Sequence, residues 1–241
     1  MPRTLNFQLR SFRSYSRAVD VASYITTCVL AYLVGSIPTG FLVGKARGID
    51  IRTVGSGNIG ATNAFRALGR AAGSAVLLVD ALKGWMAVVL LPQLVFVIFG
   101  IRPNSATREY YQILAGLAVV LGHNYTCWLK FKGGKGIATS AGVLIALVPS
   151  ALLITLLIWI VVFGLTRYVS LASLAASFAL PFAVWISGYS VLLIIVTACM
   201  GALAIYKHRS NIERLLNGTE NRFSSKSVKH GDLAEGKVRE T

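Results

Sequence analysis

Five long apolar runs, separated by short basic segments, dominate this chain. They contain no Asp, Glu, Lys or Arg and cover residues 21–44, 84–101, 110–129, 136–166 and 168–206. A helix needs about 20 apolar residues to cross the hydrocarbon core of a bilayer. The runs are continuously apolar and lack the short alternating segments of a membrane barrel. Because helices satisfy their own backbone hydrogen bonds in lipid, the pattern predicts an all-α integral membrane protein.

The lengths of the runs predict about seven transmembrane helices. The first three spans are expected over residues 21–43, 74–99 and 110–127. Residues 136–166 would form one helix about 46 Å long, which exceeds a hydrocarbon core of about 30 Å. Pro149, followed by Ser150, is expected to divide this run into two short helices. Residues 168–206 supply two more helices, with the division near residues 187–190.

Both ends of the chain are polar, and the predicted domain boundaries lie where the polar sequence meets the apolar runs. Residues 21–217 are expected to form the membrane domain, and residues 218–241 a polar, disordered cytoplasmic tail. The basic N-terminal tail covers residues 1–20. Its first 17 residues hold four Arg and no acid, which is the composition of an organelle transit peptide. Since the segment is short for a transit peptide, a plain basic tail on a bacterial membrane protein is favoured.

The distribution of Lys and Arg among the loops predicts how the helices are oriented in the membrane. The chain is 55% hydrophobic and carries a net charge of +15 from 24 Lys and Arg against nine Asp and Glu. With seven spans, 17 of these cations lie on one face, which the positive-inside rule makes cytoplasmic; six spans would divide the charge more evenly. Basic loops beside a membrane indicate anionic lipids or phosphate ligands. No nucleic-acid recognition module is present, so nucleic acid is excluded as a partner.

A glycine-rich loop at residues 55–63 is the first candidate for phosphate binding. Its three glycines allow several backbone N–H groups to point at one anion, and a helix that starts after the loop would add its N-terminus. The candidate ligand-binding residues are Ser56, Gly57, Asn58, Gly60, Thr62, Asn63 and Arg66. The alternative is a tight turn whose small residues let helices pack.

A second basic loop follows Gly122-His123-Asn124. Lys132, Gly133, Gly134 and Lys135 combine two cations with an unobstructed backbone, which suits a phosphate. The loop is not a Walker motif, because Gly136 stands where that motif has Ser or Thr. The alternative is a basic turn whose lysines reach lipid headgroups.

Two weaker motifs lie nearer the C-terminus. Ser170 and Ser173 share one helical face, although such pairs often only ease helix packing in membranes. His208 and Asn211 belong to a cationic cluster that holds one titratable imidazole. His208 and Glu213 have the spacing of the catalytic His-x4-Asp pair of acyl-CoA acyltransferases. This match is interpreted as a coincidence, with Glu213 expected to pair with a neighbouring Arg.

Three further groups have structural interpretations. Asp80 and Lys83 lie three residues apart inside a predicted span and are expected to neutralise each other. His123 is interpreted as a hydrogen-bonded interfacial histidine. The three Cys lie in apolar surroundings and are expected to be small core residues. The three His are scattered, so neither a metal site nor a cofactor is predicted.

Together these motifs resemble the PlsY-type glycerol-3-phosphate acyltransferases of bacterial membranes. The motifs that carry the resemblance, in family order, are residues 35–40, 55–63 with Arg66, 80–84, 122–123 with 131–136, 170–173 and 208–211. The chain departs from the family in its Arg-rich N-terminal extension, its longer C-terminal tail, and Ser210 and Glu213 in a segment that is often more basic.

The resemblance implies a reaction and a set of partners. Such enzymes transfer a fatty acyl group from acyl-phosphate to the 1-hydroxyl of glycerol 3-phosphate, giving 1-acylglycerol 3-phosphate (lysophosphatidic acid) and inorganic phosphate. It implies seven helices in the inner membrane of the cell, with the motif loops and the active site facing the cytoplasm. The implied partners are the two substrates and membrane lipids, with the soluble enzyme that makes acyl-phosphate as a further candidate.

The resemblance also suggests roles for individual residues. Ser56, Lys135 and His208 are the expected catalytic residues, and the other loop residues, with Ser170, Ser173 and Asn211, are expected to bind substrate. Direct attack by the glycerol hydroxyl is expected, because acyl-phosphate is already activated. A substrate phosphate would take the proton, with His208 as the rival general base. A transporter of a phosphorylated solute is the chief alternative function, although no inverted repeats are found, and a structural membrane subunit is the third.

Overall fold

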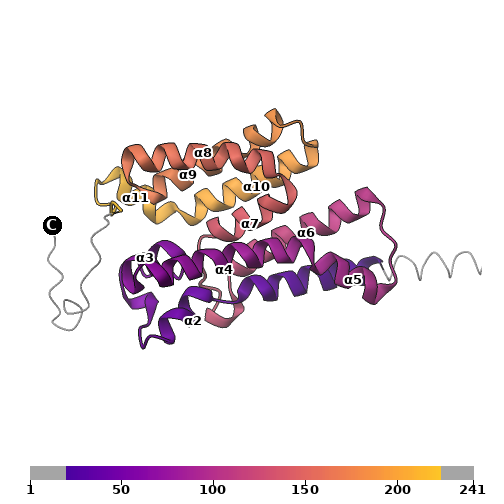
Figure 1. Cartoon of the computed structure of the whole chain (residues 1–241), viewed down its shortest axis with the longest axis horizontal. Coiled ribbons are helices and arrows are strands. Elements are labelled where there is room, and N and C mark those ends of the chain that lie inside the picture. The colour runs from indigo at the N-terminus through magenta and orange to yellow at the C-terminus, as the bar shows by residue number, and fades with distance from the viewer. Residues whose placement is uncertain (1–19, 224–241) are drawn as a thin grey trace, which may run out of the picture.

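The computed structural model describes residues 20–223, and every regular element in that part of the chain is helical (Figure 1). The first described helix covers residues 20–36. The α-helices that follow are α2 (Thr39–Lys45), α3 (Ala61–Leu68), α4 (Arg70–Val89), α5 (Leu91–Phe99), α6 (Ser105–Asn124), α7 (Ile137–Leu147), α8 (Pro149–Thr166), α9 (Val169–Ile186), α10 (Val191–Lys207) and α11 (Arg209–Leu216). Two 3₁₀ turns, Ile51–Thr53 and Cys127–Leu129, lie in the loops.

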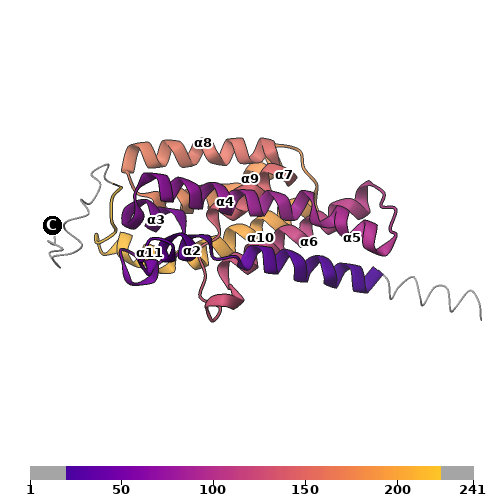
Figure 2. The same ribbon diagram turned by 60° about the horizontal axis from the view of Figure 1, so that its bottom comes forward.

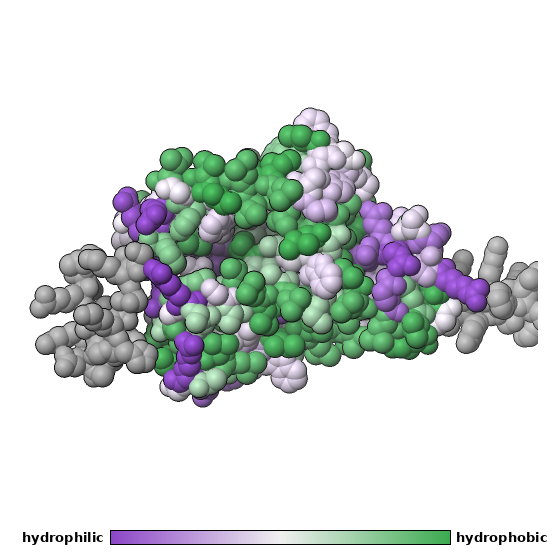
Figure 3. All heavy atoms as spheres, viewed as in Figure 1, coloured by the Kyte–Doolittle hydropathy of each residue, from purple (hydrophilic) through white to green (hydrophobic). Residues whose placement is uncertain are grey.

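The helices form two layers along one long axis. One layer contains α8, α9 and α10, and the other contains the first helix with α2, α4 and α6; α7 packs on α4 and reaches α8 (Figures 1 and 2). Apolar residues cover the middle of the surface, and polar residues gather at its two ends (Figure 3). On α8, Leu153 and Leu157 are both more than 60% exposed. Such a surface suits lipid and not water, which confirms the predicted class of an all-α integral membrane protein.

The predicted number of seven spans stays a prediction. Four helical stretches are long and apolar enough to cross a bilayer: Asp20–Lys45, Arg70–Phe99, Pro149–Thr166 and Val169–Ile186. A fifth is added if α10 and α11, which meet at 57°, are counted as one span. The predicted divisions at Pro149 and near residues 187–190 coincide with breaks between helices. Helix α7 has only 11 residues, about 16 Å, which is too short for a complete crossing.

Glycines bring the backbones of α4 and α7 into contact. A Cβ on Gly84 of α4 would collide with the backbone of Thr139, and one on Gly142 of α7 would collide with the backbone of Ala81. Small residues at such positions are the usual means of close helix packing in lipid, where no hydrophobic effect drives helices together. The α4–α7 contact fixes the loop before α7 against the middle of α4.

The first residues of the predicted C-terminal tail are ordered. Disorder was expected from residue 218 onwards, but residues 219–223 form a strap across the end of the bundle. The backbone N–H of Phe223 donates to the Arg167 carbonyl at 2.8 Å, and the Phe223 ring packs edge-on against Phe65 and Phe163. The buried Glu220 carboxylate anchors the same strap. Residues 1–19 and 224–241, which include the predicted N-terminal tail and most of the C-terminal tail, lie outside the described residues.

Candidate active site

One cavity of about 370 Å³ lies between the two layers and collects most of the predicted site residues. The predicted residues that line it are Ser56, Asn58, Gly60, Thr62, Asn63, Arg66, Lys135, Ser170, Ser173 and Asn211. The apolar part of its wall includes Leu144, Leu152, Leu156, Trp159, Leu180 and Met200. Figure 3 shows a hollow between the layers on the face viewed. Cationic and amide groups therefore occupy one part of the cavity, and mainly apolar side chains, with the hydroxyls of Thr155 and Ser177 among them, line the rest.

The loop before α3 is held in place by its own asparagine. The Asn63 carboxamide accepts from the Ser56 N–H at 2.9 Å and donates to the Ile51 and Val54 carbonyls at 3.1 Å. Gly55 and Gly57 have positive φ angles of 57° and 67°, which a glycine adopts without strain. Asn63 thus shapes the loop, although it was predicted to bind ligand. Ser56 and the N-terminal turn of α3 remain available to an anion.

Lys135 and Asn211 meet at the polar end of the cavity. The Lys135 ammonium donates to the Asn211 side-chain oxygen, so segments 76 residues apart in the chain share one wall of the site. Burial is the main cause that lowers the pKa of Lys135 to about 8. The Glu220 carboxylate acts in the opposite direction, and repulsion from the Arg214, Arg66 and Lys207 cations lowers the pKa further. A desolvated ammonium without a full counter-charge is a strong binding group for an incoming phosphate.

Glu220, which no sequence motif indicated, completes this wall. Its carboxylate accepts from the Ser170 hydroxyl, the Asn211 amide and the Arg214 guanidinium, each at 2.7 Å. Burial by itself raises the pKa of Glu220, but these three donors outweigh burial and lower the pKa below its usual value. Arg214 therefore pairs with Glu220, and the expected pairing of Glu213 with a neighbouring Arg is not found among the described residues.

Replacing Glu220 with Ala is expected to lower both the melting temperature and the activity. Three donors lose their acceptor, and Ser170 and Asn211 lose the group that orients them, at a cost of about 1–3 kcal/mol for each donor left buried without a partner. Glu213→Ala is the matched control, because it removes the same charge from an exposed position on α11. Thermal unfolding in detergent measures the effect; equal melting temperatures for the two variants would contradict the role of Glu220.

Arg66 enters the cavity from α3 and also contacts the strap. Its guanidinium donates to the Asn221 carbonyl at 3.1 Å. Burial is the main cause that lowers the pKa of Arg66, while the Glu220 carboxylate acts in the opposite direction. Arg66 and Lys135 thus supply two cations to the same end of the cavity.

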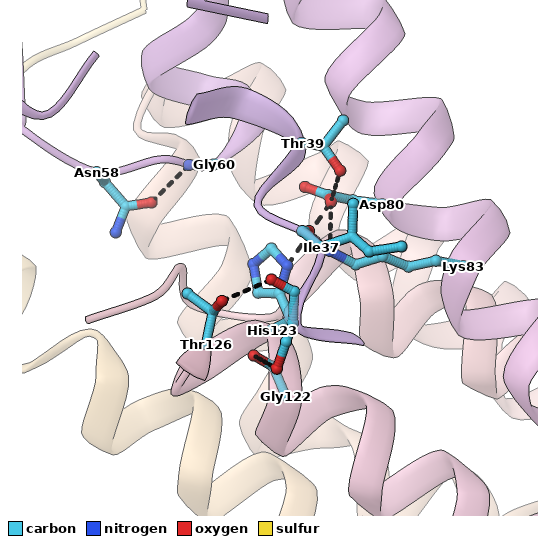
Figure 4. Close-up of polar contacts among 10 residues, drawn as sticks. Ile37, Thr39, Asn58, Gly60, Asp80, Lys83, Gly122, His123 and Thr126 are labelled. Carbon is cyan, nitrogen blue, oxygen red and sulfur yellow. Dashed lines mark hydrogen bonds and ion pairs between the residues drawn. The ribbon is translucent and has the colours of Figure 1, made fainter. Parts of the chain in front are cut away.

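A buried ion pair supports the polar end from behind (Figure 4). Asp80 Oδ1 accepts from Lys83 Nζ at 2.8 Å and from the Thr39 hydroxyl at 2.9 Å, and His123 Nδ1 lies 3.7 Å away. Asp80 and Lys83 do neutralise each other, as predicted. The pair also stabilises the break between the first helix and α2. Lys83 Nζ donates at 2.9 Å to the carbonyl of Ile37, which lies between the end of the first helix and Pro38.

The break after the first helix positions the glycine-rich loop of residues 55–63, the phosphate loop. Helix α2, which starts after the break, brings Gly40 so close to the Ile59 carbonyl that a Cβ on Gly40 would collide with it. Ile59 belongs to the predicted phosphate loop. The Asp80–Lys83 pair therefore acts on that loop through α2, while Asp80 and His123 also line the cavity.

Some predicted residues do not reach the cavity wall. These are Gly57, Lys132, Gly133, Gly134 and His208. Backbone or ring atoms of His123 and Asn124 occupy the space beside Gly133 and Gly134, so these glycines permit close packing of the loop against the end of α6. The buried His208 ring bonds through Nδ1 to the Ala204 carbonyl at 2.7 Å. This position does not favour His208 as the general base.

Fold and site together define an α-helical integral membrane protein whose cationic, amide-rich site continues into an apolar cavity. The model of the glycerol-3-phosphate acyltransferase family matches residues 25–218. The glycerol-3-phosphate acyltransferase of Geotalea daltonii is 47% identical over 203 residues, which cover 84% of this chain and 99% of that protein. The Aquifex aeolicus relative of the same name is 45% identical over 196 residues, or 81% of this chain and 96% of that protein.

Solved structures agree with the sequence relatives. The crystal structure of PlsY, an integral membrane glycerol 3-phosphate acyltransferase, in its glycerol 3-phosphate form matches with a TM-score of 0.74 and 42% identity, covering 84% of this chain and 96% of that one. Its lysophosphatidic acid form matches with a TM-score of 0.71 and 41% identity. The chain belongs to the family of membrane glycerol-3-phosphate acyltransferases.

Proposed function

We propose that this protein transfers a fatty acyl group from acyl-phosphate to the 1-hydroxyl of glycerol 3-phosphate, at a site facing the cytoplasm. The products would be 1-acylglycerol 3-phosphate and inorganic phosphate, the first acylation in phospholipid synthesis. The observation that carries the proposal is the divided cavity, with Ser56, Arg66 and Lys135 in its polar part and mainly apolar side chains along the rest. A ligand with a phosphate on a long acyl chain matches both parts.

The polar part is suited to two phosphates. Its cations, Arg66 and Lys135, and the N-terminus of α3 provide three separate centres of positive potential. The related structures hold glycerol 3-phosphate in one form and lysophosphatidic acid in the other, which supports a shared site for substrate and product here. Ser170, Ser173 and Asn211 would hold the glycerol phosphate or its hydroxyls opposite the loop.

The chemistry requires positioning more than a nucleophile. The glycerol 1-oxygen attacks the acyl carbon, the bond from that carbon to the phosphate oxygen breaks, and inorganic phosphate leaves. The hydroxyl proton passes to a substrate phosphate, whose second pKa of about 6 lies close to neutral pH. Arg66 and Lys135 stabilise the charge that moves onto the leaving phosphate, and holding both substrates in one cavity removes the entropic cost of their meeting.

The donor distinguishes this reaction from other acylations of glycerol 3-phosphate. The purified protein should form lysophosphatidic acid from acyl-phosphate, and should form none from acyl-CoA or acyl carrier protein of the same chain length. Mass spectrometry of the lipid product measures this directly. Efficient use of acyl-CoA with no use of acyl-phosphate would overturn the assignment of the donor.

The pH profile should report the charge on Lys135. Because burial lowers its pKa to about 8, the ammonium is present below that pH and is lost as pH rises through it. We therefore expect kcat/KM for glycerol 3-phosphate to fall above about pH 8. Lys135→Arg should move this alkaline limb to higher pH, since arginine stays charged. Lys130→Arg, in the same loop but exposed, is the control; an identical alkaline limb in the wild type and Lys135→Arg would refute the role of Lys135.

A further inference from the structure

Three buried residues line the apolar part of the cavity where it adjoins the core of the bundle. They are Leu144 of α7, Leu180 of α9 and Met200 of α10, and they are only 5%, 5% and 4% exposed. All three belong to the main buried core cluster. The fully buried Val148, Ala151 and Val184 are members of the same cluster, so the wall that the three residues form is backed by packed core.

The three residues of the wall come from different helices but lie at similar depth. Gly201 has no room for a Cβ because the Ser177 carbonyl lies against it, so α9 and α10 are in register there. Met200 and Leu180 both lie just beyond that contact, on the side away from the polar end. Leu144 lies seven residues after the start of α7, about 10 Å from the loop that carries Lys135.

The depth of the cavity is close to the distance that one acyl chain of a lipid spans in a bilayer. Ser170 at the polar end and Leu180 at the wall are ten residues apart on α9, which is about 15 Å. Half of a hydrocarbon core of about 30 Å is also about 15 Å, the distance that one acyl chain of a bilayer lipid crosses. A chain anchored by its phosphate at the polar end would therefore meet the wall with its methyl end.

We propose that Leu144, Leu180 and Met200 form the end wall of an acyl pocket and set the longest acyl chain that the enzyme transfers efficiently. The inference rests on the proposed function, because it takes the acyl chain of the donor as the occupant. Between the wall and the polar end, Ala176 of α9 also lines the cavity and is partly buried. A larger side chain at Ala176 should shorten the pocket, and a smaller one at Met200 should lengthen it.

The test is a competition among saturated acyl-phosphates graded in two-carbon steps. The purified enzyme receives the mixture with glycerol 3-phosphate, and mass spectrometry gives the chain distribution of the lysophosphatidic acid. Met200→Ala should shift the distribution towards longer chains, and Ala176→Phe towards shorter ones. The ratio of long to short products should change by roughly tenfold, the effect of burying about two more methylene groups.

Leu193→Ala is the matched control, because Leu193 is 5% exposed and belongs to the same core cluster but does not line the cavity. It should lower stability and leave the distribution unchanged. Active Met200→Ala and Ala176→Phe enzymes with the wild-type distribution would overturn the end wall and leave the proposed function intact. A wild-type enzyme that acylates glycerol 3-phosphate from none of the acyl-phosphates would instead overturn the proposed function, and the end wall with it.

Discussion

Lys135→Ala is expected to reduce kcat/KM for glycerol 3-phosphate by about 10²- to 10³-fold, the usual effect of removing one preorganised group that stabilises transition-state charge. Lys135 lines the polar end of the cavity and touches Asn211. Removing it leaves a substrate phosphate without one of its two cations, in a site partly closed to water. Arg66 cannot compensate, because it approaches from α3 and also holds the strap through Asn221.

The same variant should keep its fold. Burial is the main cause that lowers the pKa of Lys135, so its charge does not stabilise the free protein. Because the substitution also removes the donor to the Asn211 side-chain oxygen, the melting temperature of Lys135→Ala should stay close to that of the wild type. Lys130→Ala, an exposed cation of the same loop, should retain both activity and stability. Wild-type turnover in Lys135→Ala would remove Lys135 from the active site.

A large loss of stability is expected from Asp80→Asn. This substitution leaves the buried Lys83 ammonium without its counter-charge, a change that typically costs about 3–5 kcal/mol. Lys83→Met should be comparably destabilising, because it leaves the Asp80 carboxylate uncompensated and removes the donor to the Ile37 carbonyl. Thermal unfolding of each variant in the same detergent measures the loss.

The double variant Asp80→Asn with Lys83→Met separates the effect of the two buried charges on stability from the effect of the pair on the position of α2. It removes both charges, so much of the stability should return. Activity should stay low, because the break at residues 37–38 has lost the donor that holds it and α2 no longer fixes Ile59 in the phosphate loop. Asp50→Asn, in an exposed pair with Arg52, is the control and should change little. Full activity in the double variant would show that the pair does not position the loop.

The helices were predictable because lipid imposes a simple requirement. A charge-free run must satisfy its backbone within itself, so the runs locate the helices and Pro149 marks a real division. The short α7 was predicted as the first of two short helices, but the physical reason for its length could not be found in the run itself. Its length depends on how deeply the Lys135 loop descends beside α4, and this is fixed by Gly84 and Gly142, whose partners lie far away in sequence.

The candidate site could be predicted at positions where the residue type has one common role in binding sites. Two cations beside flexible loops indicate a phosphate, and Arg66 and Lys135 do line one cavity. Glycines are ambiguous, because the missing side chain admits either a ligand or another backbone. Gly133 and Gly134 were assigned to a ligand, and the structure places the His123–Asn124 segment there. Glu220 gave no signal, since an acidic residue in a polar tail looks solvated until its three donors are known.

Direct attack by the glycerol hydroxyl requires both phosphate-bearing substrates to occupy one cavity at the same time. The measurement is inorganic phosphate release by enzyme mixed with equimolar acyl-phosphate, with and without glycerol 3-phosphate. We expect no burst of phosphate in the absence of glycerol 3-phosphate, and equal amounts of phosphate and lysophosphatidic acid in its presence. A stoichiometric burst without the acceptor would mean that the acyl group is first transferred to the protein, and would rule out direct attack.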